Sequence, residues 1–200
     1  MTTPETSAMS LRERKKRKVR QTIRLEAFRL FAEQGYQATT VDQIAAAAEV
    51  SPSTFFRYFT TKEAVILSDE YDPMLAEALA RRPQGEPVIA AVRHALNDSL
   101  LQVLQADRDE LITRIRLTFT DPDIRARAMD EQLRNQDAAA EALAAHVGRP
   151  ADDLEVKCAA AAIIAVSMTI LRHWVDGGGT ADLAELYDRQ LDILATGLRL

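Results

Sequence analysis

The chain has 200 residues, of which 47% are apolar and 28% charged, a balance that favours one or two folded domains over disorder. No apolar run approaches the roughly 20 residues that cross a bilayer. The start has no apolar stretch after its charges, so we expect neither a membrane segment nor a secretory signal. The single cysteine, Cys158, lies among alanines and is expected to be a small buried apolar residue. These features predict a cytoplasmic protein.

The net charge of −5 argues weakly against a nucleic-acid partner, but its distribution argues the opposite. Residues 1–62 hold eleven Lys or Arg against six Asp or Glu, a net of +5, whereas residues 63–200 carry a net of −10. A basic head on an acidic body is typical of a phosphate-binding module joined to another domain. A charge run alone is as often a solvated surface, so the elements must decide.

The chain reads as helix throughout, and we predict an all-α fold of about nine helices. The first helix runs from about Arg14 to Gln34, with apolar residues at three- and four-residue spacing, and Gly35 ends it. The second opens at Thr40, which forms a capping box with Gln43.

The third helix opens at Ser51, with Pro52 at the first helical position, where its missing N–H costs nothing. Phe55 and Phe59 are its predicted inward pair. The tight turn before it contains Glu49. The second and third helices are each about two turns long, so they must pack on the first helix to be stable.

A fourth helix begins with a second predicted capping box, Thr60 with Glu63, and runs to about Arg81. Further helices are expected at about 87–105, 108–119, 122–147, 152–176 and 181–199. We predict a disordered basic arm at 1–13, a small helical domain at 14–62, and a larger helical domain at 63–200, whose functions the following motifs indicate.

Three short helices with the third exposed form the helix-turn-helix arrangement, in which the third enters the major groove of DNA. The exposed positions of the third helix carry hydroxyls that reach phosphate oxygens, an arginine that reads guanine, and an aromatic side chain that contacts a thymine methyl. These positions are Ser53, Thr54, Phe56, Arg57 and Tyr58.

Lys62 lies in the first turn of the fourth helix, where the helix dipole disfavours a cation. A DNA phosphate beside it removes this conflict, so we predict a phosphate contact rather than a solvated surface lysine. The basic tract Lys15, Lys16, Arg17 and Lys18 is expected to bind DNA as an arm in the minor groove or on flanking phosphates. The alternative is a solvated tail in which only Arg17, Lys18 and Arg20 touch DNA.

The stretch VDQIAAAAEVSPSTFFRYFTTKEAVI resembles the DNA-binding region of the TetR family of bacterial regulators. The resemblance covers residues 14–70 and implies two sets of contacts. Phosphates are expected at Thr40, Ser51, Thr54, Tyr58 and Lys62, and base edges near Pro52, Ser53, Phe56 and Arg57. Two residues depart from the family pattern: Phe56 replaces a tyrosine, and Glu49 replaces a common glycine. If Glu49 is left-handed, it costs roughly 1–2 kcal/mol relative to glycine.

The last two predicted helices are apolar on two faces, which indicates burial on both sides. Two such helices meeting their copies make a four-helix homodimer interface around a two-fold axis, as the resemblance also implies. The alternative is burial entirely inside one subunit.

The remaining helices are expected to enclose an effector site, because TetR-like regulators release DNA when a small molecule binds. Its candidate lining is Tyr71, Met74, His94, Leu101, Met129, Leu133, Met168 and Trp174, although Met and aromatic residues more often form plain core. The stretches RIRLTFTDPDIRARAMDEQLRNQDAAAEALAAHVGRP and HWVDGGGTADLAELYDRQLDIL are similar to regulators grouped with the mycofactocin-system regulator. That similarity implies an acyl-CoA-like effector, with fatty acids as rivals. Arg116, with Arg114, Arg125 and Arg127, then meets its phosphate or stays solvated.

Catalysis finds little support in the sequence. The three histidines have no cysteine or paired carboxylates at ligand spacing, so we expect no metal and no cofactor. Gly177–Gly179 lacks the Lys-Ser/Thr of a phosphate-binding loop, and no nucleophile elbow is present. We therefore predict a DNA-binding regulator, a homodimeric repressor that a small lipophilic effector such as an acyl-CoA releases from operator DNA, and not an enzyme. The alternatives are a helical enzyme or lipid carrier without DNA function, and an effector-independent regulator.

Overall fold

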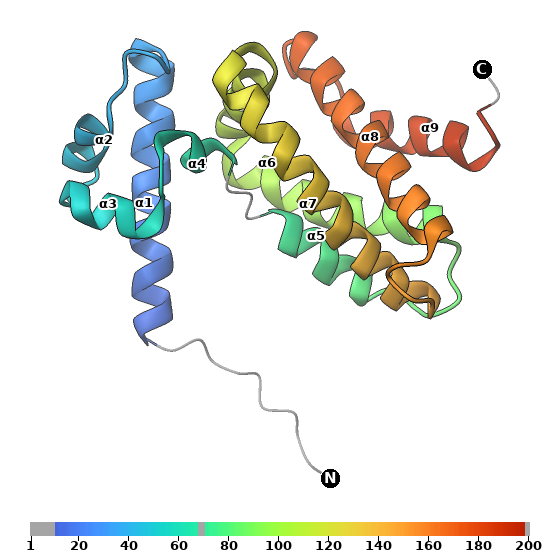
Figure 1. Cartoon of the computed structure of the whole chain (residues 1–200). Coiled ribbons are helices and arrows are strands. Elements are labelled where there is room, and N and C mark those ends of the chain that lie inside the picture. The colour runs from blue at the N-terminus through green and yellow to red at the C-terminus, as the bar shows by residue number, and fades with distance from the viewer. Residues whose placement is uncertain (1–10, 68–70, 199–200) are drawn as a thin grey trace. The chain divides into compact units, whose positions relative to one another are not determined.

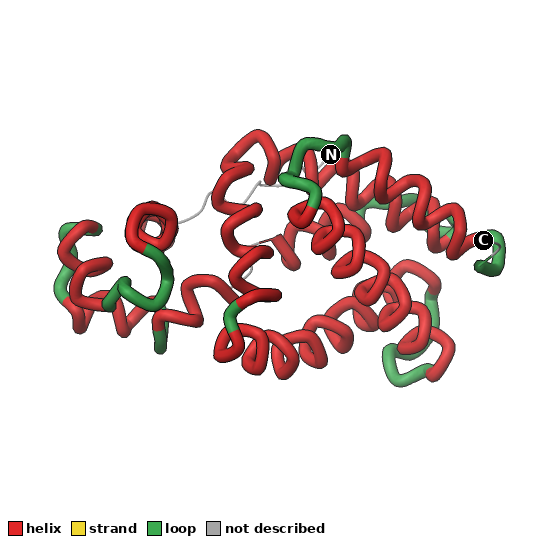
Figure 2. The backbone as a smooth tube through the Cα atoms, turned by 90° about the horizontal axis from the view of Figure 1, so that it is seen from above, coloured by secondary structure: helices red, strands yellow, loops and turns green. Residues whose placement is uncertain are grey.

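The computed structural model describes residues 11–67 and 71–198, and within these ranges the chain is all helical (Figures 1 and 2). The chain divides into two compact units, Met1–Val65 and Ile66–Leu200. The predicted all-α fold is confirmed.

Unit 1 contains α1 (Leu11–Gln34), α2 (Val41–Ala47), α3 (Pro52–Tyr58) and the start of α4 (Lys62–Leu67). Figure 1 shows the first turns of α1 projecting past α2 and α3. Residues 11–13, which were assigned to a disordered arm, belong to α1, so that part of the prediction is wrong; residues 1–10 of the predicted arm lie outside the described residues. Leu, Arg and Glu are good helix formers, and no breaking residue separates them from the rest of α1.

The core of unit 1 explains how two short helices remain stable. α1 contributes Ile23 and Ala27, both fully buried, and α2 contributes Ile44. From α3 and its C-terminal end, Phe55 is 0% exposed and Phe59 is 2% exposed. This confirms the predicted inward pair.

Unit 2 contains α5 (Tyr71–Ala80), α6 (Val88–Thr120), α7 (Pro122–Val147), α8 (Leu154–Asp176) and α9 (Leu183–Ala195). Two boundaries differ from the prediction. The expected helices 87–105 and 108–119 are one helix, α6, because neither Gly nor Pro interrupts them. The expected helix from Thr60 to Arg81 is two helices, α4 and α5, and residues 68–70 between them lie outside the described residues.

Two predicted joints of unit 2 are confirmed. Asp121 caps α7 by accepting from the backbone N–H groups of Asp123 and Ile124, and Pro122 follows at the first helical position. Gly148 ends α7 in the left-handed conformation at φ 67°. Proline at the start and glycine at the end are the usual terminal residues of a helix.

The core of unit 2 gathers around Trp174, which is 2% exposed and donates from Nε1 to the carbonyl oxygen of Ala181 at 2.9 Å. The turn between α8 and α9 packs on the same ring. Gly179 has a φ of 67°, and a Cβ on it would lie 2.6 Å from Cδ1 of Ile112. The side chain of Arg108 donates to the carbonyl oxygen of Gly179. Packing therefore requires glycine at position 179.

α8 contains an 18-residue window with a mean hydropathy of 1.9, so by length and composition it is apolar enough to cross a membrane. The expectation that no apolar run approaches this length is wrong. Core helices of soluble proteins have the same composition, and one face of α8 packs into unit 2 through Val156, Ala160 and Ile163. Only 22% of the window is buried, however, so much of its apolar surface is uncovered within one chain.

Cys158 is exposed, and the expectation that it is buried is wrong. It lies four residues after Leu154, which is 74% exposed, and therefore on the outer face of α8. The buried face runs through Val156, Ala160 and Ile163 instead.

Candidate nucleic-acid interface and effector region

The N-terminus of α2 is held by the predicted capping box. The Thr40 hydroxyl accepts from the Gln43 backbone N–H at 3.2 Å, and Gln43 Oε1 accepts from the Thr40 backbone N–H at 2.9 Å. Gln34 adds a hydrogen bond from Nε2 to the same Gln43 oxygen at 3.0 Å, which ties the end of α1 to α2.

The turn between α2 and α3 passes through Glu49, whose φ is 55°. Its left-handed conformation, which the sequence left conditional, costs roughly 1–2 kcal/mol relative to glycine. The Val50 N–H donates to the Ala45 carbonyl oxygen at 2.9 Å, which closes the turn at the end of α2. α3 then leaves at an angle that the caps on both helices fix.

Ser51 caps α3 and begins a short chain of hydroxyl groups. Its Oγ accepts from the Thr54 N–H at 3.1 Å and donates to Thr54 Oγ1 at 2.9 Å. Because its proton is used there, the contact of 2.9 Å between Ser51 and Ser53 has Ser53 as the donor. Within this chain, the Thr54 hydroxyl keeps its own proton for an acceptor outside.

The outer face of α3 carries the side chains that the sequence assigned to base edges. Pro52, Ser53 and Arg57 are exposed, and Phe56 has an exposed fraction of 52%. Tyr58 is half-buried, with the Arg57 guanidinium 5.5 Å from its ring centroid. The structure thus brings the predicted α3 residues together on one accessible surface.

Lys62 has partners inside unit 1. Its Nζ donates to the carbonyl oxygens of Tyr36 at 2.8 Å and Thr39 at 2.9 Å, and it lies 3.9 Å from the centroid of the Tyr36 ring. Two carbonyl groups and an aromatic face already balance the cation, so no phosphate is required to explain its place in the helix, and the predicted phosphate contact stays a prediction. Two of its three N–H groups are committed, which leaves one for any ligand.

The second predicted capping box is also wrong by one residue. The Ala64 N–H donates to the hydroxyl of Thr61 at 3.1 Å, so Thr61 caps α4 in place of Thr60. Glu63 accepts a hydrogen bond from the Tyr36 hydroxyl at 2.7 Å. The Glu63 side chain thus binds the hydroxyl of the distant Tyr36, whereas a capping box would use it to bind the backbone N–H of Thr60.

The basic tract Lys15, Lys16, Arg17 and Lys18 belongs to the first turns of α1, and all four side chains are exposed. The sequence left open whether this tract is an arm or a tail, but in the structure it is helical. The helical backbone agrees with the predicted first helix from about Arg14, and contact of these residues with DNA stays a prediction.

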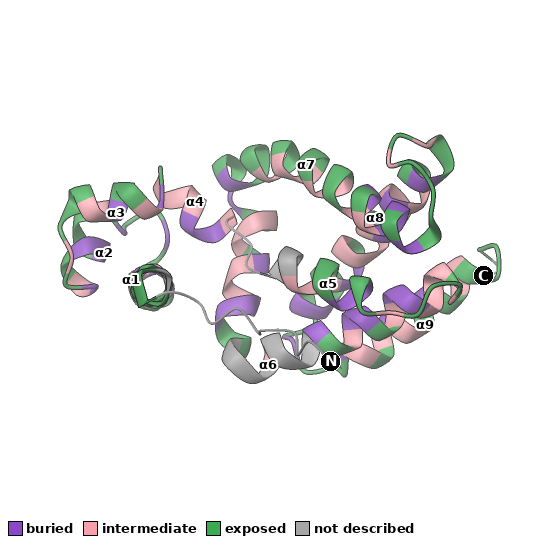
Figure 3. Ribbon diagram, turned by 90° about the horizontal axis from the view of Figure 1, so that it is seen from below, coloured by how far each residue is buried: buried purple, intermediate pink, exposed green. Residues whose placement is uncertain are grey.

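The candidate effector residues are not brought to one site. Trp174 is core, Met168 is half-buried in α8, and Arg116 is exposed. Met129 and Leu133 of α7 are 66% and 65% exposed, and Figure 3 shows that α7 carries many exposed residues. Met129 and Leu133 are thus exposed and enclose no site within the described chain, whereas a lining role of the buried Trp174 stays a prediction. Helical spacing does not show which face of a helix is covered. The side chains of Tyr71 and Leu101 lie outside the described residues.

Met74 does line a hollow of about 160 Å³ in unit 2, together with Glu77, Arg81 and Ser99. Sites for drug-sized ligands have volumes of about 300–1,000 Å³. In this state the hollow is therefore too small for a long acyl chain.

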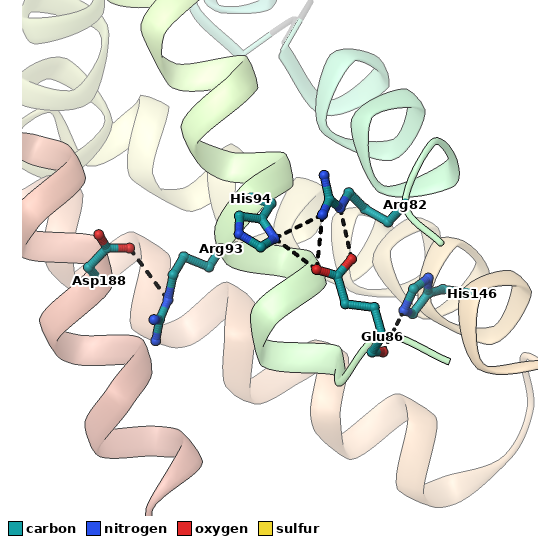
Figure 4. Close-up of polar contacts among 6 residues, drawn as sticks. All are labelled: Arg82, Glu86, Arg93, His94, His146 and Asp188. Carbon is teal, nitrogen blue, oxygen red and sulfur yellow. Dashed lines mark hydrogen bonds and ion pairs between the residues drawn. The ribbon is translucent and has the colours of Figure 1, made fainter. Parts of the chain in front are cut away.

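Sequence reasoning missed a polar cluster around Glu86, in the loop before α6 (Figure 4). The Glu86 carboxylate accepts from Arg82 Nε at 2.8 Å and contacts His94 Nδ1 at 2.8 Å, and its backbone oxygen accepts from His146 Nε2 at 3.0 Å. The Arg82 hydrogen bond, followed by His94, lowers the pKa of the Glu86 carboxyl to about 2. His94 is thus part of a surface ion cluster, and its expected place in an effector cavity is wrong. The only local signal was the Arg-x₃-Glu spacing across a Pro-Gln-Gly turn.

The chain belongs to the TetR family of bacterial transcriptional regulators. The sequence family described as "Bacterial regulatory proteins, tetR family" matches residues 23–68, and the one described as "MftR C-terminal domain" matches residues 86–199. Members of the TetR family bind operator DNA and form dimers. The resemblance stated from the sequence is confirmed, and so is the prediction of a regulator that is not an enzyme.

Two curated relatives extend over most of the chain. The HTH-type transcriptional regulator TcmR of Streptomyces glaucescens is 34% identical over 172 residues, which is 82% of this chain and 76% of TcmR. The HTH-type transcriptional repressor AcnR of Corynebacterium diphtheriae is 29% identical over 187 residues, 90% of this chain and 91% of AcnR.

Among solved structures, FadR of Thermus thermophilus has a TM-score of 0.62 and 29% sequence identity, and the match covers 90% of this chain and 95% of that one. FadR is a TetR-family transcriptional repressor, and that structure is a complex with lauroyl-CoA.

Proposed function

We propose that this regulator is a repressor that binds operator DNA through α3. A small lipophilic anion, such as an acyl-CoA, releases it from the DNA. DNA binding is supported by the pair of capped helices α2 and α3, which are joined by a turn at Glu49 and present one exposed face. A helical enzyme or lipid carrier has no need of this arrangement. The place of action is the cytoplasm, on nucleoid DNA.

On the operator, the residues divide by chemistry. Ser53, Phe56 and Arg57 are exposed and reach base edges, with Pro52 beside them. Thr54 has a hydroxyl proton to donate to a phosphate. Thr40 and Ser51 are exposed and Tyr58 is half-buried, and we propose phosphate contacts for them as well. Lys62 acts by holding the turn before α2, so we propose it as a positioning residue and, at most through one N–H, as a phosphate contact.

We propose that the homodimer forms through α8 and α9. The uncovered apolar surface of α8 needs a partner in water, and a two-fold interface covers it with its own copy. A two-fold dimer then presents its two α3 helices about 34–36 Å apart, one turn of DNA. This spacing is the property that an effector must change.

The effector proposal is supported by the match to a repressor solved with lauroyl-CoA. If the effector binds at the hollow beside Met74, that hollow must widen, and we propose a more open state of unit 2 for this step. The acyl chain supplies the driving force, at about 0.8 kcal/mol for each buried CH₂ group. Affinity should therefore rise about fourfold with each added carbon until the cavity is filled.

The test uses a fluorescent duplex from the DNA upstream of the protein's own coding sequence. Anisotropy should show binding, and adding acyl-CoAs of eight to sixteen carbons should release the duplex in order of chain length. If no DNA binding occurs, the DNA proposal fails. If DNA binds but neither acyl-CoAs nor fatty acids bind at micromolar concentration, only the effector proposal fails.

A further inference from the structure

The first turns of α1 form a charged rod that the fold does not require. Residues 12 and 14–18 are six basic residues, all exposed, ahead of the part of α1 that packs on α2 and α3. At 1.5 Å per residue, residues 11–18 span about 12 Å. Figure 1 shows this end of α1 standing clear of the other helices of unit 1.

Six cations against one acid, Glu13, destabilise the first turns of the helix that carries them. Cations near the start of a helix meet the positive end of the helix dipole. Like charges three or four residues apart, such as Arg12 with Lys16 and Arg14 with Lys18, destabilise it further. A polyanion beside the rod reverses both effects, because it neutralises the side chains.

The charges also point in two opposite directions. With 100° per residue, Lys16 lies on the face that continues through Arg20 to the fully buried Ala27. Lys18 lies about 200° away, on the face of Leu25 and Arg29, which are exposed. One phosphate backbone touching the inner face therefore cannot reach Lys18 and its neighbours Arg14 and Lys15.

We infer that this rod lies between two phosphate backbones of the DNA that flanks the bases read by α3, and binds both. A helix with side chains is about 10–12 Å wide, which fits a major groove of about 12 Å but not a minor groove of about 6 Å. The inference rests on the proposed function, and it excludes the minor-groove arm for the helical part of the tract. The partner is DNA backbone, without base preference.

The experiment compares Lys16→Ala with Lys18→Ala, two exposed lysines of one helix that lie on opposite faces. Operator affinity is measured against KCl concentration, where each phosphate contact contributes about 0.9 to the slope of log affinity. Each variant should flatten the slope by about one unit, which is roughly a threefold to fourfold change in relative affinity between 50 and 200 mM salt.

Arg29→Ala is the matched control, because Arg29 shares the outer face with Lys18 but is paired with Glu26 and Glu33 at 2.8 and 2.7 Å. It removes the same charge and should leave the slope unchanged. Removing about ten flanking base pairs from each side of the duplex should abolish the effect of Lys18→Ala.

An unchanged slope for Lys18→Ala on the long duplex overturns the inference, since the outer face then meets no phosphate. The same holds if Arg29→Ala flattens the slope equally, which marks a general charge effect. If the unaltered protein binds no upstream DNA, the proposed function itself fails, and this result is distinct from both.

Discussion

Replacing Lys62 with alanine separates its role in the fold from contact with DNA. The change removes two hydrogen bonds from a charged donor to the carbonyl oxygens of Tyr36 and Thr39, and its contact with the Tyr36 ring. Hydrogen bonds from charged groups contribute about 1.5–3 kcal/mol each, and cation–π contacts about 0.5–1 kcal/mol at exposed sites. Because Lys62 is half-buried, water replaces part of this, and we expect a loss of about 2–3 kcal/mol.

Hydrogen exchange measures this loss locally, which matters because the chain has two units. Backbone amides of α2 and α3 should exchange roughly 30- to 160-fold faster in Lys62→Ala than in the unaltered protein. Lys18→Ala removes the same charge from an exposed position and should stay within about 0.5 kcal/mol.

The same variants are used in a second measurement, the salt dependence of operator binding. If Lys62 holds the turn, Lys62→Ala lowers affinity without flattening the salt slope. A flattened slope with unchanged hydrogen exchange would refute the reasoning, because that pair of results describes a lysine on a phosphate.

Four further outcomes are expected. Phe55→Ala should cost unit 1 about 3–5 kcal/mol and remove the exchange protection of α2 and α3, and normal protection would contradict the assigned core. Gly179→Ala should lower the thermal midpoint more than Gly178→Ala, because both have positive φ but only position 179 lacks space. Since the pKa of Glu86 is lowered to about 2, its stabilisation is complete above the ordinary value of 4.5 and is lost as pH falls towards 2; Glu86→Gln should remove that part of the acid dependence in urea titrations. Cys158 should react with a bulky maleimide more slowly at concentrations that favour the dimer, and equal rates would exclude the face of α8 around Cys158 from the interface.

The DNA-binding face was predictable because its rules are local. A cap such as Thr40 with Gln43 spans three residues, and so does the pair Ser51 and Thr54. The burial of Phe55 follows from helix phase once its start is fixed. Each of these inferences needs only a few consecutive residues and no knowledge of the tertiary fold.

Lys62 shows where such reasoning stops. The sequence correctly identifies a cation in an unfavourable place, but its compensation comes from carbonyl groups 23 and 26 residues away. The capping-box prediction for Glu63 is wrong for the same reason, since its carboxylate accepts a hydrogen bond from the distant Tyr36 hydroxyl. A residue at a locally unfavourable position indicates that it has a compensating interaction partner. Only the tertiary structure identifies that partner.

The effector region was not predictable, because apolar side chains on helices give the same signal for core and cavity. Trp174 is 2% exposed and Met129 is 66% exposed, yet both follow helical spacing. The small hollow beside Met74 adds a thermodynamic consequence. If an open state is populated to about 1%, the apparent affinity of any effector falls about 100-fold below its affinity for that state. Substitutions that loosen the closed packing should therefore tighten effector binding and weaken operator binding together, because one equilibrium governs both.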